Sequence, residues 1–271
     1  MQAFLTHPAV QAVLAPFLIS LLVAELLQRI RLSGLAIIAG LAITVYLLGG
    51  IAFPPLTGSQ KIIWLSIASG LLAIPLSLFN WSLWRPVITV LAAAGAVWVV
   101  QRTLLQQPTA VALQWGAGCA LYTGWIAYWM DDLSNSPVRA GSGGLALGLG
   151  TGVTLLIAGS TLLGKYDLAI GSATAAYLFI MFVSNNHLPC GRSFTLPLAL
   201  VTATTGCLAV LTTKLPWYAL AALAVIPLAA KLPVSDKYSV WVQTTLLSAA
   251  TMALALLAAY LSWSIHGWAA F

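Results

Sequence analysis

Charged side chains are scarce in this 271-residue chain: they make up 6% of it, with 11 Lys and Arg against 5 Asp and Glu. Because an ordinary soluble domain carries about 25% charged residues, the composition excludes a water-soluble fold. Hydrophobic residues reach 61%, and the mean hydropathy is +0.99. Lipid is therefore the expected solvent, and we expect a single transmembrane domain over residues 1–271 with no soluble domain.

Basic clusters and a cysteine framework are also lacking. The net charge of +6 comes from basic residues that occur singly or in pairs between apolar runs, which argues against a nucleic-acid partner. Of the three cysteines, Cys119 and Cys207 lie inside apolar runs, so a disulfide framework is not expected. The first apolar stretch has no basic segment before it and exceeds the length of a signal peptide, so we interpret it as a retained helix.

Ten apolar runs, separated by charges, Pro and Gly clusters, predict an all-α polytopic membrane bundle of about ten transmembrane helices. Their lengths suit helices, since a membrane barrel would show shorter, alternating segments. The ninth run is short and contains Pro227, so a nine-helix bundle is the alternative. The runs are Pro8–Leu27, Ser33–Phe53, Ile62–Asn80, Pro86–Leu104, Thr109–Met130, Gly143–Leu163, Leu168–Ser184, Phe194–Thr213, Pro216–Ala230 and Val240–Ser262.

The distribution of basic residues predicts the orientation. Connections after odd-numbered helices hold seven of them, namely Arg29, Arg31, Arg85, Arg139, Arg192, Lys231 and Lys237. Those after even-numbered helices hold four, namely Lys61, Arg102, Lys165 and Lys214. Since cytoplasmic loops are enriched in Lys and Arg, we predict odd connections in the cytoplasm and both termini outside, with the bacterial inner membrane as the location.

Two helices carry stripes of small residues at every fourth position. The sixth run has Gly144, Gly148 and Gly152, and the fifth has Gly116, Ala120 and Gly124. Such stripes let neighbouring backbones approach closely. We expect these two helices to pack antiparallel, small face against small face. The other interpretation of the glycines is a surface that slides or a groove that admits a ligand.

Glu25 is the candidate ion-coupling residue, because it is the one acidic residue expected close to membrane depth, where a charge is costly. It lies about one turn from the end of the first helix, with Arg29 four residues later, so a surface ion pair is the competing interpretation. The remaining acidic residues are expected in connections; they are Asp131, Asp132, Asp167 and Asp236.

Two polar loops supply the candidate substrate-binding residues: Asp131 and Asp132 after the fifth helix, and Asn185, Asn186 and His187 after the seventh. Under the predicted topology both loops lie on the cytoplasmic side and share a vestibule. Adjacent carboxylates can bind a divalent cation, but a solvated turn is the simpler interpretation. His187 and Cys190 have ligand-like spacing, yet two ligands make no zinc site. No metal and no cofactor is therefore expected.

Three functions remain for such a chain. The first is a small permease or secondary carrier, supported by the helix number and the small-residue faces. The second is a non-catalytic subunit, assembly factor or scaffold of a membrane complex, supported by how few polar residues the helices hold. A lipid-acting membrane enzyme is third, since only the Asp131–Asp132 pair supports it. The expected partners are the bilayer and either a second copy of the chain or a membrane complex, and an enzyme is the less favoured class.

Overall fold

The computed structural model describes residues 7–30, 32–51, 53, 57–78, 84–213, 215–235 and 238–266. It is 84% helical, and none of these residues lies in a strand. The all-α class expected from the apolar runs is confirmed. Of the residues used above for the topology, Arg31, Lys214 and Lys237 lie outside the described part, as does Asp236.

Each apolar run contains helical structure, but α7 (Pro137–Ile157) and α8 (Thr161–Ser184) begin six and seven residues before the runs predicted for them. Pro227 does divide the ninth run, since the chain bends at Val225 between two short helices. The elements, with their bounds, are η1 (Val10–Leu14), α2 (Ala15–Leu27), η2 (Gln28–Ile30), η3 (Ser33–Leu35), α3 (Ala36–Leu47), α4 (Gly58–Leu78), α5 (Trp84–Leu104), α6 (Thr109–Asp132), α7 (Pro137–Ile157), α8 (Thr161–Ser184), α9 (Arg192–Thr212), α10 (Trp217–Ala224), α11 (Ile226–Ala229) and α12 (Val240–His266).

Seven of the described helices are long and apolar enough to cross a membrane: the η1–α2 segment, α4, α5, α7, α8, α9 and α12. Two further apolar segments, Ser33–Leu47 and Trp217–Ala229, are shorter. Helix α6 has the length, with 24 residues, but its many Trp, Tyr and Gly residues lower its hydropathy. A membrane bundle is therefore well supported, whereas the expected number of ten crossings is not established by length and composition.

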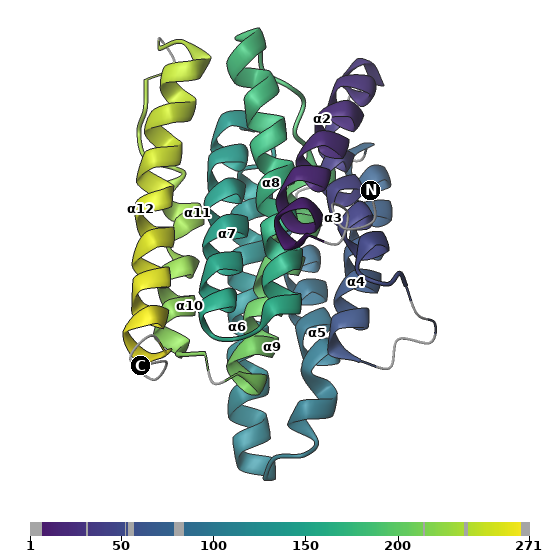
Figure 1. Ribbon diagram of the computed structural model, residues 1–271, viewed down its shortest axis with the longest axis vertical. Helices are drawn as coiled ribbons and strands as arrows, with labels where there is room; N and C mark the ends of the chain where they lie inside the picture. The colour runs from purple at the N-terminus through teal and green to yellow at the C-terminus, as the bar shows by residue number, and fades with distance from the viewer. Residues whose placement is uncertain are drawn as a thin grey trace.

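Helices α7, α8 and α9 form the centre of the bundle. Within their membrane-spanning windows 72%, 61% and 89% of the residues are buried, against 33% for α5 and for α12. Figure 1 shows α12 at one edge and α2 to α4 at the other, with α7 and α8 between them. The central helices are therefore shielded from lipid by the others.

The glycines of α7 bring that helix into backbone contact with α8, which corrects the predicted partner. A Cβ atom placed on Gly148 would lie 2.5 Å from the backbone N of Gly171, and one on Gly152 would lie 2.9 Å from the backbone N of Leu168. Gly144 faces Leu198 and Thr174 instead. The close packing was expected correctly, but α8 rather than α6 is the neighbour.

The small residues of α6 face α5, so the predicted α6–α7 contact is wrong on this side as well. A Cβ atom on Gly116 would meet Leu104 at 3.3 Å, and one on Gly124 would meet Thr89 at 3.4 Å. Both neighbours are side-chain atoms at or near ordinary contact distance. Together with Ala120, these glycines line hollows on the outer surface between α5 and α6, so here the small residues form the floor of a groove.

Gly148→Ala is expected to destabilise the protein, because the added methyl group would overlap the backbone of Gly171. Such overpacking costs about 1–3 kcal/mol. Gly118→Ala is the matched control: it lies in α6 with open space around its Cβ position, and helix propensity predicts a gain of up to about 1 kcal/mol. Thermal unfolding in detergent measures both. Equal midpoints for the two variants would contradict the close α7–α8 contact.

Candidate functional site

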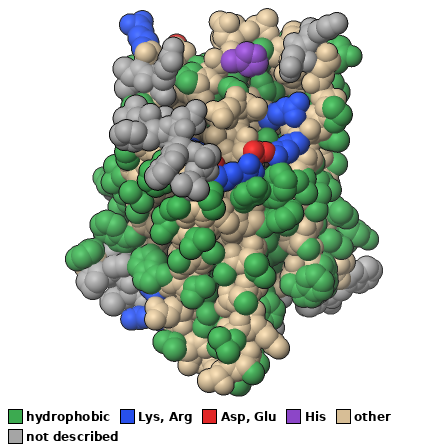
Figure 2. All heavy atoms as spheres, turned by 180° about the vertical axis from the view of Figure 1, so that it is seen from behind, with side chains coloured by type: hydrophobic (Ala, Val, Ile, Leu, Met, Phe, Trp, Pro, Cys, Tyr) green, Lys and Arg blue, Asp and Glu red, His purple; other side chains and the backbone are tan. Residues whose placement is uncertain are grey.

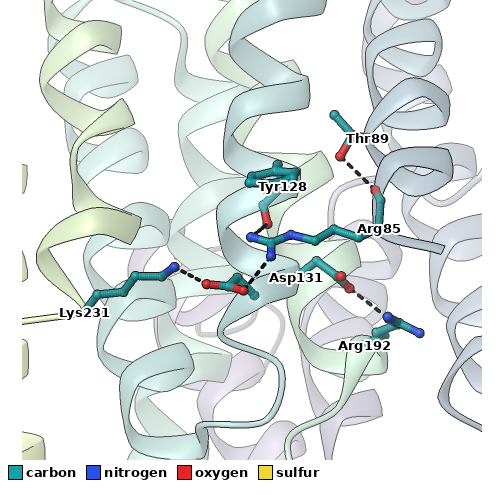
Figure 3. A network of polar contacts seen from close by, with 7 residues as sticks. Arg85, Thr89, Tyr128, Asp131, Arg192 and Lys231 are labelled. Carbon is teal, nitrogen blue, oxygen red and sulfur yellow. Dashed lines mark hydrogen bonds and ion pairs between the residues drawn. The ribbon is translucent and has the colours of Figure 1, made fainter. Parts of the chain in front are cut away.

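A cluster of ion pairs joins several helices at one end of the bundle. The carboxylate of Asp132, the last residue of α6, forms an ion pair with Arg85 of α5, with 2.7 Å between Oδ1 and Nη1. The same carboxylate also pairs with Lys231, which follows α11. Beside it, the Asp131 carboxylate accepts a hydrogen bond from Nε of Arg192 in α9 at 2.9 Å. Figure 3 shows the two adjacent carboxylates turned toward different partners. We call these five residues the ion-pair cluster.

Aromatic rings and backbone carbonyls hold the cations of this cluster in place. The Arg85 guanidinium lies 3.7 Å from the centre of the Tyr128 ring, and Lys231 Nζ lies 4.0 Å from the centre of the Trp129 ring. Arg139 donates to the Lys231 carbonyl at 3.0 Å. Cation–π contacts of this kind are strongest where water is excluded, so the cluster is bound into the protein instead of being freely solvated.

The two polar loops do meet, as expected from the topology. The Gly191 amide donates to the Ser134 carbonyl at 3.0 Å, and Arg192 ties the same region to Asp131. Arg192 also donates to the Leu76 carbonyl at the end of α4, at 2.9 Å. These contacts place the end of α4 beside the connections after α6 and α8.

The predicted binding residues do not converge on one pocket. Asp131 and Asp132 end α6 instead of lying in the following loop, and each is occupied by a cation of the protein. By contrast, Asn185, Asn186 and His187 are exposed at the end of α8. Asn185 closes that helix in the left-handed conformation, with φ at 51°, which Asn tolerates well. The interaction of Asp131 with Arg192 could not be read from sequence.

Glu25 lies on an exposed part of α2, and its carboxylate accepts a hydrogen bond from Gln28 Nε2 at 2.6 Å. No ion pair joins it to Arg29 among the described residues. An exposed carboxylate close to a helix end stays accessible to water and headgroups. Its position therefore gives no support to a coupling role.

Asp167 is the buried carboxylate that sequence reasoning assigned wrongly to a connection. It lies in the second turn of α8 and is 0% exposed, and within the described ranges neither of its side-chain oxygens makes a well-formed hydrogen bond. The charged form of such a group costs several kcal/mol in an apolar interior. The missed signal is that the helical run extends back to Thr161, which places Asp167 on the face opposite the neighbouring Lys165.

Three helices surround Asp167. The backbone of α7 comes closest at Gly148, where a Cβ atom would lie 3.2 Å from the Asp167 carbonyl oxygen. The side chain of Thr205 in α9 lies within hydrogen-bonding reach of the Asp167 carboxyl group, and Tyr122 of α6 lies within electrostatic range of it. The Thr205 hydroxyl donates to the Val201 carbonyl of its own helix at 2.8 Å, so its proton is already used.

A hollow of about 240 Å³ opens between α6, α9 and α10 on the far side of Tyr122. Its lining is almost entirely apolar and includes Trp115, Tyr122, Cys207 and Trp217. Tyr122 thus belongs both to the wall of this hollow and to the surroundings of Asp167.

No group of three or more His, Cys, Asp or Glu residues within the described ranges is arranged to hold a metal ion. Cys190 and His187, which have ligand-like spacing in the sequence, differ in environment: Cys190 is buried, while His187 is exposed. Burial raises the pKa of the Cys190 thiol, so it stays protonated and is a poor ligand and nucleophile at neutral pH. Compared with known proteins, the chain matches no family model and no curated protein.

We expect Asp131→Asn to destabilise the protein more than Asp132→Asn. The Asp131 side chain is 3% exposed and that of Asp132 is 32% exposed. Removing one partner of a buried pair costs about 3–5 kcal/mol, while a partly exposed pair contributes about 1 kcal/mol or less. Unfolding midpoints in detergent test the order, with Glu25→Gln as a surface control. The reverse order would show that Asp132, which has two cationic partners, is the more important anchor.

Proposed function

We propose that the chain is a small multi-pass carrier that couples solute movement to a proton, with Asp167 as the proton-binding group. The observation that carries this is the complete burial of Asp167, whose carboxyl group has no cationic partner among the described residues. An ionisable side chain inside a membrane bundle is costly and marks proton relays and substrate pathways in membrane proteins. In the closed conformation the carboxyl group holds its proton; opening toward water releases it.

The surroundings of Asp167 support a path for a solute. The hollow beyond Tyr122 is apolar and aromatic, which suits a small uncharged molecule. At the other end of the bundle the ion-pair cluster closes the space between α5, α6 and α9. In this proposal Asp167 takes the role that the sequence assigned to Glu25.

The alternative is a non-catalytic subunit or scaffold, and one observation favours it. Four hollows among the described residues have almost no polar lining, whereas a carrier is expected to enclose a polar cavity. A scaffold would use such surfaces for a second copy or for a membrane partner. The lipid-acting enzyme loses its support, because both carboxylates of its Asp pair are engaged by cations.

For the topology we propose ten crossings in a bacterial inner membrane, with both termini outside. Lys165 at the start of α8 donates to Gln11 of η1 at 3.3 Å, and Ser262 of α12 donates to the Thr154 carbonyl at the end of α7 at 3.2 Å. Since a short turn joins α7 to α8, both ends of the described chain lie toward the same side, which supports an even number of crossings. The ion-pair cluster then faces the cytoplasm, in line with the basic residues.

Single-cysteine labelling tests this topology. In a background without native cysteines, His187→Cys is exposed and should react with a membrane-impermeant maleimide in inside-out vesicles but not in right-side-out vesicles. A variant that keeps only Cys190 is the control from the same loop, because its buried thiol should react only after unfolding. Labelling of His187→Cys from the outer face would reverse the orientation.

Asp167→Asn should abolish solute-driven proton movement while the folded protein persists, because Asn keeps the shape and removes the titrating proton. Proteoliposomes that contain a pH-sensitive dye, screened with small uncharged solutes, measure this flux. Glu25→Gln is the matched carboxylate control and should retain wild-type flux, as its side chain is exposed. Infrared spectroscopy adds a readout that needs no solute: the band of a protonated carboxylic acid should be present in wild type and lost in Asp167→Asn. Unchanged flux and an unchanged band would remove Asp167 from the mechanism and favour the scaffold.

A further inference from the structure

The outer face of the α5–α6 pair carries a groove made of two adjoining hollows. One has a volume of about 330 Å³ and the other about 450 Å³, and Ala120 lines both. The floor is shallow because the residues there are small, with Ala93 on α5 and Gly124 on α6. From Thr89 to Leu105 the groove follows about 24 Å of helix, most of the roughly 30 Å hydrocarbon thickness of a bilayer.

One end of this groove meets the ion-pair cluster. Tyr128 lines the smaller hollow, and the Arg85 guanidinium lies 3.7 Å from the centre of its ring. Lys231 is the next cation, because it shares the Asp132 carboxylate with Arg85. In Figure 2 most of the visible basic and acidic side chains gather in the upper half of the face, above a broad hydrophobic surface.

Positive charge is in excess at this end of the groove. Arg85 and Lys231 are balanced by one carboxylate, that of Asp132, and Arg139 contributes a further cation whose guanidinium bonds a neutral carbonyl. The buried Nε–H of Arg85 has no acceptor among the described residues. Asp131 does not reduce the excess, because Arg192 neutralises it.

We propose that this groove binds an anionic lipid, with its phosphate headgroup at Arg85 and Lys231 and its hydrocarbon chain along Ala93, Ala120 and Gly124. Guanidinium groups bind phosphate oxygens with directional hydrogen bonds, and basic pockets between helices on the cytoplasmic side of a membrane bind lipid phosphates. Charge selects the headgroup, and the apolar groove holds the chain. This inference does not depend on the proposed transport function.

The test uses purified protein in a neutral detergent with three probes: phosphatidylglycerol, zwitterionic phosphatidylcholine, and inorganic phosphate. Phosphatidylglycerol should bind saturably, as measured by native mass spectrometry, and should raise the unfolding midpoint. Phosphatidylcholine should bind more weakly because its choline group cancels the headgroup charge. Inorganic phosphate should have little effect because it leaves the groove empty.

Two variants separate the headgroup from the chain. Arg85→Gln should weaken phosphatidylglycerol binding about five-fold, the effect of one cation near a membrane surface. Ala120→Leu fills the groove without changing charge and should weaken binding at least as much while the lipid-free midpoint stays near that of wild type. Arg29→Gln is the control, since it removes an exposed cation from η2, away from the α5–α6 groove, and should leave binding unchanged.

Each contrary result has a definite meaning. Equal binding of the two lipids by wild type and both variants would show an ordinary lipid contact and overturn the proposal. Inorganic phosphate reproducing the full effect, with Ala120→Leu unaffected, would show an anion site without a lipid chain and would also overturn it. Loss of binding in Arg29→Gln equal to that in Arg85→Gln would show a general charge effect and would refute the assignment to Arg85.

Discussion

The backbone contact between α7 and α8 is the constraint on which the rest of the bundle depends. Lipid offers no hydrophobic driving force between helices, so close van der Waals packing has to hold them together. At Gly148 and Gly171 no side chain separates the two helices. Helices α2, α3 and α12 pack against this pair, while α4, α5 and α6 pack against α9, whose membrane-spanning window is 89% buried. A side chain at Gly148 would separate the two central helices and disturb every element packed against them.

This close packing also explains why Asp167 makes no well-formed hydrogen bond within the described ranges. Most buried hydroxyl groups in the centre of the bundle form hydrogen bonds within their own helix. Thr202, Thr204 and Thr205 each donate to the carbonyl four residues earlier. Such bonds leave few donors for neighbouring helices. A charged carboxylate carries no hydrogen, so it cannot donate a hydrogen bond to a carbonyl of its own helix. Asp167 is therefore a buried carboxyl group that no cation among the described residues neutralises.

Sequence reasoning found helical structure in every apolar run because the membrane dictates helix length and composition, but it misplaced the starts of α7 and α8 and could not assign the neighbours of the helices. Small residues at every fourth position occur on both α6 and α7, and nothing local in either helix specifies a partner. Asp167 was placed in a connection because Lys165, two residues earlier, indicated an interface. On a helix such residues face nearly opposite directions, so Lys165 reaches Gln11 while Asp167 points into the bundle. The pairing of Asp131 with Arg192 depends on tertiary structure and had no local signal.

The Asp131–Asp132 pair and Asp167 differ in whether neighbouring cations neutralise their charge. Asp131 and Asp132 are the conspicuous ones in the sequence, yet their charges are matched by cations of the protein: Arg192 pairs with the buried Asp131, and Arg85 and Lys231 pair with the partly exposed Asp132. That arrangement holds helices together and leaves only excess positive charge to attract a ligand. Asp167 has no such compensation. Because its cost is not recovered by any contact that stabilises the fold, a chemical role such as carrying a proton gives the more economical account of its presence.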